Sequence, residues 1–187
     1  YYSEIDKWFR EVSNKFEQFE GQLRRRFIER LQMTVGSSQR VLYADCYKLT
    51  RYSEEWYCLR GGAVIDADTE YKVYYAYENE KGELRLVLLA SIPKSTGVKL
   101  YVCRLPNVPR MYTPTCWSAL ARDGTRCIFS RIDDLVEFLR RNNYVNDKAA
   151  SVRSILIDMI ARIAKTEEVA DSSACPCKPS NYDTCQK

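Results

Sequence analysis

Hydrophobic residues in the first part of the chain recur every three or four positions. They are Ile5, Trp8, Phe9, Val12, Phe16, Phe19, Leu23, Phe27 and Leu31. This spacing places all of them on one face of an α-helix, and it predicts one amphipathic helix over about residues 3–33. Residues 1–20 carry five acids against three bases, and residues 21–33 carry four arginines against one acid. That order of charge complements the helix dipole and supports the prediction.

A helix with aromatic side chains along one face must bury that face. We expect it to pack on the sheet of its own chain; the alternative is that it projects and packs on a neighbouring subunit. In that alternative the contact residues for a protein partner or for self-association are Trp8, Phe9, Phe16, Phe19 and Phe27.

From residue 40 to residue 130 the pattern changes to short runs rich in Val, Ile, Tyr and Leu. The predicted strands are residues 40–49, 55–60, 63–66, 70–78, 84–91, 98–105, 116–121 and 125–129. Turn sequences such as Asp123-Gly124 separate them. Strands that follow one another without helices between them predict an antiparallel sheet or a partly open barrel of about six to eight strands.

Helical spacing returns after residue 130. One helix is predicted to end at Asn142-Asn143 and a second to run over about residues 147–165. The predicted fold class is therefore α+β, with four segments: a long helix (1–35), an antiparallel β-core (40–130), a two-helix segment (130–166) and a tail rich in Cys and Pro (167–187).

The chain contains eight cysteines, an even number that suits a disulfide framework whose pairing the spacing leaves open. They are Cys46, Cys58, Cys103, Cys116, Cys127, Cys175, Cys177 and Cys185. The lone C-x-C at Cys175 leaves a four-cysteine metal site as the weaker interpretation. We expect disulfides, with the tail tethered by them.

Disulfides indicate an oxidising compartment, so we expect an extracellular, cell-surface or virion-surface location; the alternative is the cytosol of a hyperthermophile. The sequence begins at Tyr1 without a methionine, which favours a mature or trimmed product. No run of about 18 apolar residues is present, so no membrane-spanning segment is expected.

Composition limits the chemistry. There is no histidine, which excludes Ser-His-Asp and Cys-His triads, HExxH zinc sites and any imidazole base. The formal net charge is +4, well short of the excess typical of a dedicated phosphate-binding protein. We expect no catalytic residues and no cofactor, and the chain is not expected to be an enzyme.

Two alternatives remain open at this level. A basic stretch with interleaved aromatic residues is typical of single-stranded nucleic-acid surfaces; its candidate contacts are Arg24, Arg25, Arg26, Lys99, Arg104, Arg110, Arg122 and Arg126. Asp66 and Asp68 fall on one face of a predicted strand end, where two carboxylates could hold a divalent cation for a metal-dependent enzyme. The simpler interpretations are a solvated strand face and a turn cap.

The favoured function is a non-catalytic structural or assembly protein outside the cytosol, such as a surface, filament or virion subunit. It rests on the absent histidine, the abundant cysteine, the aromatic-striped helix and the tyrosine-rich strands, with 14 tyrosines in the chain. A homo-oligomer is the expected state.

Overall fold

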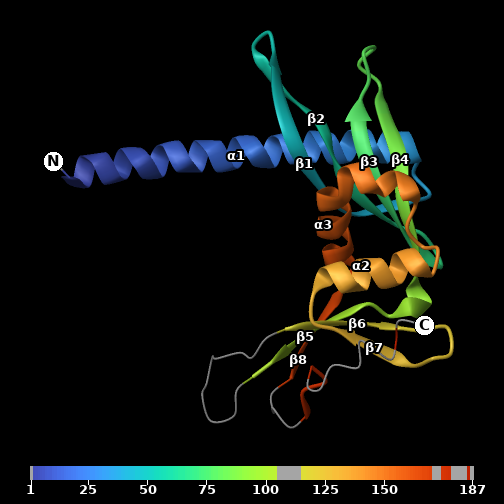
Figure 1. Cartoon of the computed structure of the whole chain (residues 1–187). Helices are drawn as coiled ribbons and strands as arrows, with labels where there is room; N and C mark the ends of the chain where they lie inside the picture. Colours follow the sequence, from blue (N-terminus) through green and yellow to red (C-terminus); the bar gives the residue numbers. More distant parts are fainter. Residues whose placement is uncertain (1, 105–114, 170–173, 178–184, 186–187) are drawn as a thin grey trace.

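The computed structural model describes residues 2–104, 115–169, 174–177 and 185. It is an α+β fold with a long N-terminal helix, two four-stranded sheets and two later helices (Figure 1). The predicted fold class is confirmed. The eight strands divide between two sheets of four, where the sequence predicted one antiparallel sheet or a partly open barrel.

The first sheet is a meander in the order β1-β2-β3-β4, with every neighbouring pair antiparallel. Its strands are β1 (Arg40–Tyr52), β2 (Glu55–Asp66), β3 (Glu70–Glu78) and β4 (Leu84–Pro93). Residues 55–60 and 63–66, predicted as two strands, form one. Gly61 and Gly62 continue β2, and they pair with Ala76 and Tyr75 of β3.

The second sheet has the order β7-β6-β5-β8. Its strands are β5 (Lys99–Cys103), β6 (Cys116–Leu120), β7 (Arg126–Phe129) and β8 (Lys165–Val169). β8 runs parallel to β5, in register from Lys99 with Lys165 to Cys103 with Val169. The sequence did not predict this strand, because its Lys-Thr-Glu-Glu-Val run lacks an apolar alternation. A short 3₁₀ turn, Lys94–Thr96, joins the two sheets.

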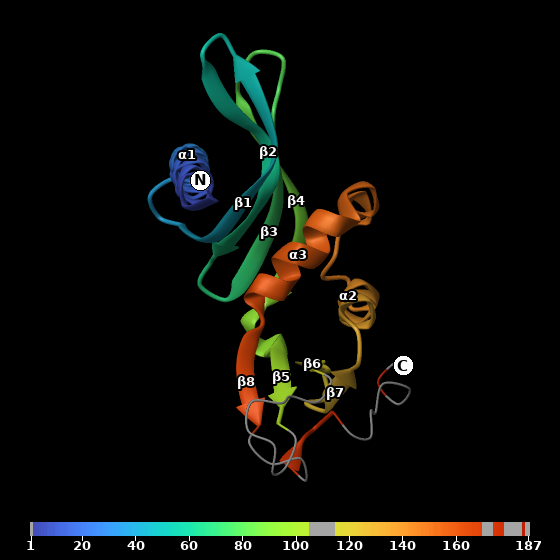
Figure 2. The same ribbon diagram turned by 90° about the vertical axis from the view of Figure 1, so that its left-hand side faces the viewer.

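Helices cover both faces of the first sheet. α1 (Tyr2–Val35) lies on one face and α3 (Arg153–Ile163) on the other, with α2 (Ile132–Arg141) beneath α3 (Figure 2). The last helix is shorter than its predicted range, because Asp147–Val152 form a 3₁₀ helix. The main core lies between the first sheet, α2, α3 and the second sheet; its largest buried side chains include Ile92, Phe129, Leu135, Leu156, Met159 and Ile160.

All eight cysteines form disulfides, in the pairs Cys46–Cys58, Cys103–Cys175, Cys116–Cys177 and Cys127–Cys185. The three cysteines after residue 170 form their bridges with β5, β6 and β7 in turn. Multiple disulfides are consistent with an extracytoplasmic location. Among the described residues, no helix is both long and apolar enough to cross a bilayer.

Candidate interaction site

The apolar stripe of α1 is buried only along its last third. Leu23, Phe27 and Leu31 lie against the first sheet, and Phe27 is 1% exposed. The strand residues beneath them are small, which lets the helix approach closely; they include Ala44, Ala63 and Ala76. The expected packing of the helix on its own sheet therefore holds for this third. Phe27, a candidate partner contact from the sequence, is instead buried within its own chain.

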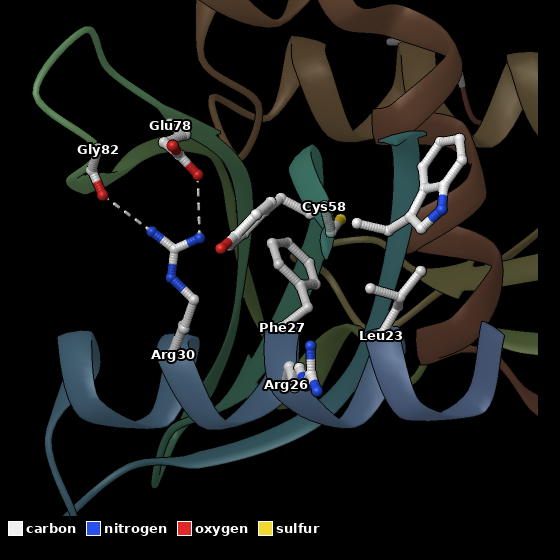
Figure 3. Close-up of a pocket in the computed structure, with 9 residues that line it drawn as sticks. Leu23, Arg26, Phe27, Arg30, Cys58, Glu78 and Gly82 are labelled. Carbon is white, nitrogen blue, oxygen red and sulfur yellow. Dashed lines mark hydrogen bonds and ion pairs between the residues drawn. The ribbon is translucent and has the colours of Figure 1, made fainter. Parts of the chain in front are cut away.

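Ion pairs hold the same part of α1 to the sheet. The Arg30 guanidinium donates to the Glu78 carboxylate and to the carbonyl oxygen of Gly82, both at 3.1 Å (Figure 3). Arg24 lies 3.4 Å from the Asp45 carboxylate. Because these contacts reach β1 and the β3–β4 hairpin, they fix the direction in which the helix leaves the sheet.

The N-terminal half of α1 projects away from the sheet (Figure 1). Trp8 and Phe9 are each 58% exposed and Phe16 is 62% exposed, while Val12 and Phe19 are half-buried. These residues continue the stripe that the sheet covers further along the helix. Three of the five sequence-predicted contact residues, Trp8, Phe9 and Phe16, are therefore exposed on this face of the helix, whereas Phe19 is half-buried.

A hollow of about 340 Å³ lies where this exposed stripe meets the β1–β2 hairpin. Val12, Lys15, Phe16, Phe19 and Trp56 line it. The rings of Phe19 and Trp56 meet edge to face with centroids 5.9 Å apart. Sequence reasoning missed Trp56, because no pattern in the strand indicates that a side chain at the start of β2 contacts the helix. An apolar hollow with one lysine at its wall can accept an apolar side chain that has an acidic neighbour.

A second hollow of about 200 Å³ lies deeper between α1 and the sheet (Figure 3). Its lining residues are Leu23, Arg26, Phe27, Arg30, Trp56, Tyr57, Cys58, Glu78 and Gly82. Trp56 lines both hollows, so the apolar surface continues from the projecting helix to the edge of the buried core.

Contacts with α3 fix the base of the β1–β2 hairpin. The Tyr47 hydroxyl hydrogen-bonds to the Asp158 carboxylate, and the Arg162 guanidinium lies 4.6 Å from the centre of the Tyr43 ring. Burial and then the hydrogen bond to Asp158 raise the pKa of Tyr47 above its usual value. The hydroxyl donates this hydrogen bond and so anchors β1 to the helix behind it.

Six of the eight basic residues proposed for nucleic-acid binding have ion-pair or hydrogen-bond partners within the protein. Lys99 pairs with Glu167 at 2.9 Å and Arg104 with Glu168 at 3.1 Å. Both glutamates come from β8, so the unpredicted strand supplies the acids that face this basic stretch. Each pair neutralises charge that a phosphate would otherwise meet.

Four other members of that set, Arg24, Arg25, Arg122 and Arg126, also have polar partners within the protein. Arg122 donates to the carbonyl oxygen of Asn142 at 3.0 Å, and Arg126 donates to Ser118 Oγ at 2.8 Å. Of the helix arginines, Arg25 donates to the carbonyl oxygen of Gly21 at 3.4 Å; Arg24 and Arg26 belong to the contacts and the hollow described above. The interleaved Tyr101 and Phe129 are buried, Trp117 packs on the core, and Arg110 and Tyr112 lie outside the described residues.

Asp66 and Asp68 do not converge on a cation site. Asp66 Oδ1 lies 2.6 Å from Nζ of Lys94, and Asp68 is exposed in the turn after β2. The hydrogen bond to Asp66 raises the pKa of Lys94. Among the described residues, the one group of possible metal ligands is Cys103, Cys175 and Cys177, and each sulfur of this group is already bonded in a disulfide.

Comparisons with models of protein families, with curated proteins and with solved structures gave no match.

Proposed function

We propose that the protein is a non-catalytic assembly subunit that works outside the cytosol and associates through the apolar face of the projecting half of α1. The observation that carries this proposal is the exposure of Trp8, Phe9 and Phe16 on the same stripe that the sheet buries at Leu23, Phe27 and Leu31. Burying one such side chain contributes about 1.5–3 kcal/mol. Contiguous exposed aromatic faces of this kind are uncommon on monomeric proteins and typical of protein–protein contact sites.

Two further features support this proposal over its alternatives. Four disulfides suit a protein that must persist in an oxidising environment. Nucleic-acid binding has less support, because Glu167 and Glu168 of β8 form ion pairs with the basic stretch. A metal site at Asp66 also has less support, because Lys94 forms an ion pair with Asp66.

Measuring the oligomeric state against concentration tests the proposal. We expect the wild-type chain to associate reversibly in sedimentation equilibrium. The Phe9→Ser/Phe16→Ser variant should bind at least about tenfold more weakly, because losing one interface anchor costs more than about 1 kcal/mol.

The matched control is Met33→Ser, which removes an apolar side chain that is 84% exposed near the other end of the same helix. Its dissociation constant should equal that of the wild type. A wild-type chain that stays monomeric at millimolar concentration would exclude self-assembly through this face.

A further inference from the structure

We infer that the partner on this face is a second copy of the same chain, whose α1 lies antiparallel to the first, with the two-fold axis near residue 10. This inference rests on the proposed function and adds the identity and orientation of the partner. In this pair, the first turn of the second copy's α1 fills the hollow at Trp56.

The body of the protein excludes a symmetric parallel pair. α1 is one continuous helix from Tyr2 to Val35, and β1 and β2 cover its stripe at Leu23, Phe27 and Leu31. In a parallel two-fold pair, the last third of each helix would face the last third of the other, where each sheet already lies. The helix projects past one side of its sheet (Figure 1), so in an antiparallel pair the two bodies would lie at opposite ends and only the projecting halves would overlap.

The exposed apolar residues are self-complementary in the antiparallel arrangement. With the axis near residue 10, Phe9 and Val12 of the two copies meet at the centre, and Ile5 lies against Phe16. Tyr2 of one copy then reaches the hollow beside Phe19 and Trp56 of the other. The apolar positions at residues 5, 8, 12, 16, 19, 23 and 27 have the three-four-four spacing of an 11-residue repeat. That spacing keeps a stripe on one side of a nearly straight helix over its whole length.

One pair of opposite charges beside the stripe, Glu4 and Lys15, is complementary in the same arrangement. Glu4 and Lys15 are 11 residues apart, so they lie on one side of the stripe, about three helical turns from each other. A two-fold antiparallel pair brings this side of one helix against the same side of the other. Glu4 of each copy then lies beside Lys15 of the other, and Lys15 is a residue that lines the hollow.

The area available is enough for a stable pair. The aromatic residues involved are exposed by 38–80% (Tyr2, Trp8, Phe9, Phe16 and Trp56). At about 200 Å² for each full aromatic side chain, they bring roughly 600 Å² per copy into the contact. Two copies together reach the lower end of specific protein–protein interfaces, about 1,200 Å².

A charge-exchange experiment tests the orientation. Glu4→Lys gives a chain that presents lysine at both positions, and Lys15→Glu gives a chain that presents glutamate at both. Each variant alone should associate roughly tenfold more weakly than the wild type, because both attractive contacts become repulsive. Mixed in equal amounts, with one of them isotopically labelled, they should form mainly the mixed pair in native mass spectrometry, since both contacts are attractive again.

Lys7→Glu is the control, because it makes the same charge change as Lys15→Glu on the side of the helix away from the stripe. It should associate like the wild type and show no preference for the Glu4→Lys chain. Statistical mixing of the two test variants would overturn the antiparallel pair while leaving assembly through α1 intact. A monomeric wild type would overturn both proposals, and the two failures are therefore distinguishable.

Discussion

A Cβ atom at Gly61 would lie 2.1 Å from the carbonyl oxygen of Asp45 and 3.0 Å from Cε1 of Phe27. The carbonyl oxygen of Asp45 belongs to the backbone, so it cannot move aside in the way that the end of a flexible side chain can. The register of β1 against β2 also shifts next to this contact, between Cys46 and Lys48. Because Gly61 has no side chain, β1 and α1 can both pack closely against β2 at this point. This close packing indirectly sets the angle at which the helix projects.

We predict opposite effects for two glycine-to-alanine changes. Gly61→Ala should lower the free energy of unfolding by about 2–3 kcal/mol, because the new methyl group overpacks the strand and helix. Gly21→Ala should raise it by about 0.5–1 kcal/mol, because Gly21 is helical with nothing within 4 Å of its Cβ position. Urea unfolding followed by tryptophan fluorescence measures both. A Gly61→Ala variant as stable as the wild type would show that this close approach does not limit the packing.

Among the elements, the two bridges Cys103–Cys175 and Cys116–Cys177 span almost the same segment of chain. Their sequence separations are 72 and 61, whereas Cys46–Cys58 closes a separation of only 12. Sγ of Cys103 and Sγ of Cys177 lie 3.7 Å apart, so the two bridges touch. Either of them alone keeps residues 175–177 on the second sheet.

The effects of removing these two bridges should therefore not be additive. The comparison needs a chain that already lacks the Cys127–Cys185 bridge, because that bridge closes a similar loop, with a separation of 58. In that Cys127→Ala/Cys185→Ala chain, replacing Cys103 and Cys175 by alanine leaves a closed loop through Cys116–Cys177 and should cost about 3 kcal/mol by the loop-closure relation. Removing Cys116–Cys177 as well should then cost about 4 kcal/mol, because no remaining bridge closes the long loop. Urea unfolding of the three variants gives both steps.

The control combines the Cys46→Ala/Cys58→Ala substitutions with Cys103→Ala/Cys175→Ala in one chain. These bridges belong to different sheets, so their effects should add within about 0.5 kcal/mol. Equal costs for the first and second tail bridge would mean that the bridges act independently, contrary to their placement.

Sequence pattern predicted the elements whose burial follows from their own residues. The helix expected over residues 3–33 is α1 (Tyr2–Val35), because nine apolar positions repeat along it. The sequence did not predict β8, because this strand forms only by pairing with the distant strand β5, beginning with Lys165 of β8 opposite Lys99 of β5. The stripe of the candidate site was visible in sequence, but which part of it stays exposed depends on where β1 ends against the helix. The contact of Trp56 with Phe19 likewise exists only in the folded chain.

At the scale of the whole molecule, the two sheets differ in what holds them. The first sheet has helices on both faces, with a cluster around Phe27 and Leu31 on one side and the main core on the other. The second sheet packs on the main core with one face only. Its other face has a small cluster, Tyr101, Cys116 and Ile128, to which Val169 and Cys177 add. Three of the four disulfides join this sheet to the tail, so cross-links stabilise it where apolar burial is limited.

Reduction should therefore open the molecule in two stages. With dithiothreitol and no denaturant, we expect backbone amides of β5, β6 and β7 to lose protection in hydrogen-exchange mass spectrometry. Amides of β2, β3 and α3 should keep most of theirs, because their protection comes from packing and not from bridges at the second sheet. The last third of α1 should also stay protected, so the projecting half keeps its base and association through it should survive reduction. Simultaneous loss of protection in both sheets would show that the chain unfolds as one unit, and that the disulfides stabilise the assembly face as much as they stabilise the second sheet.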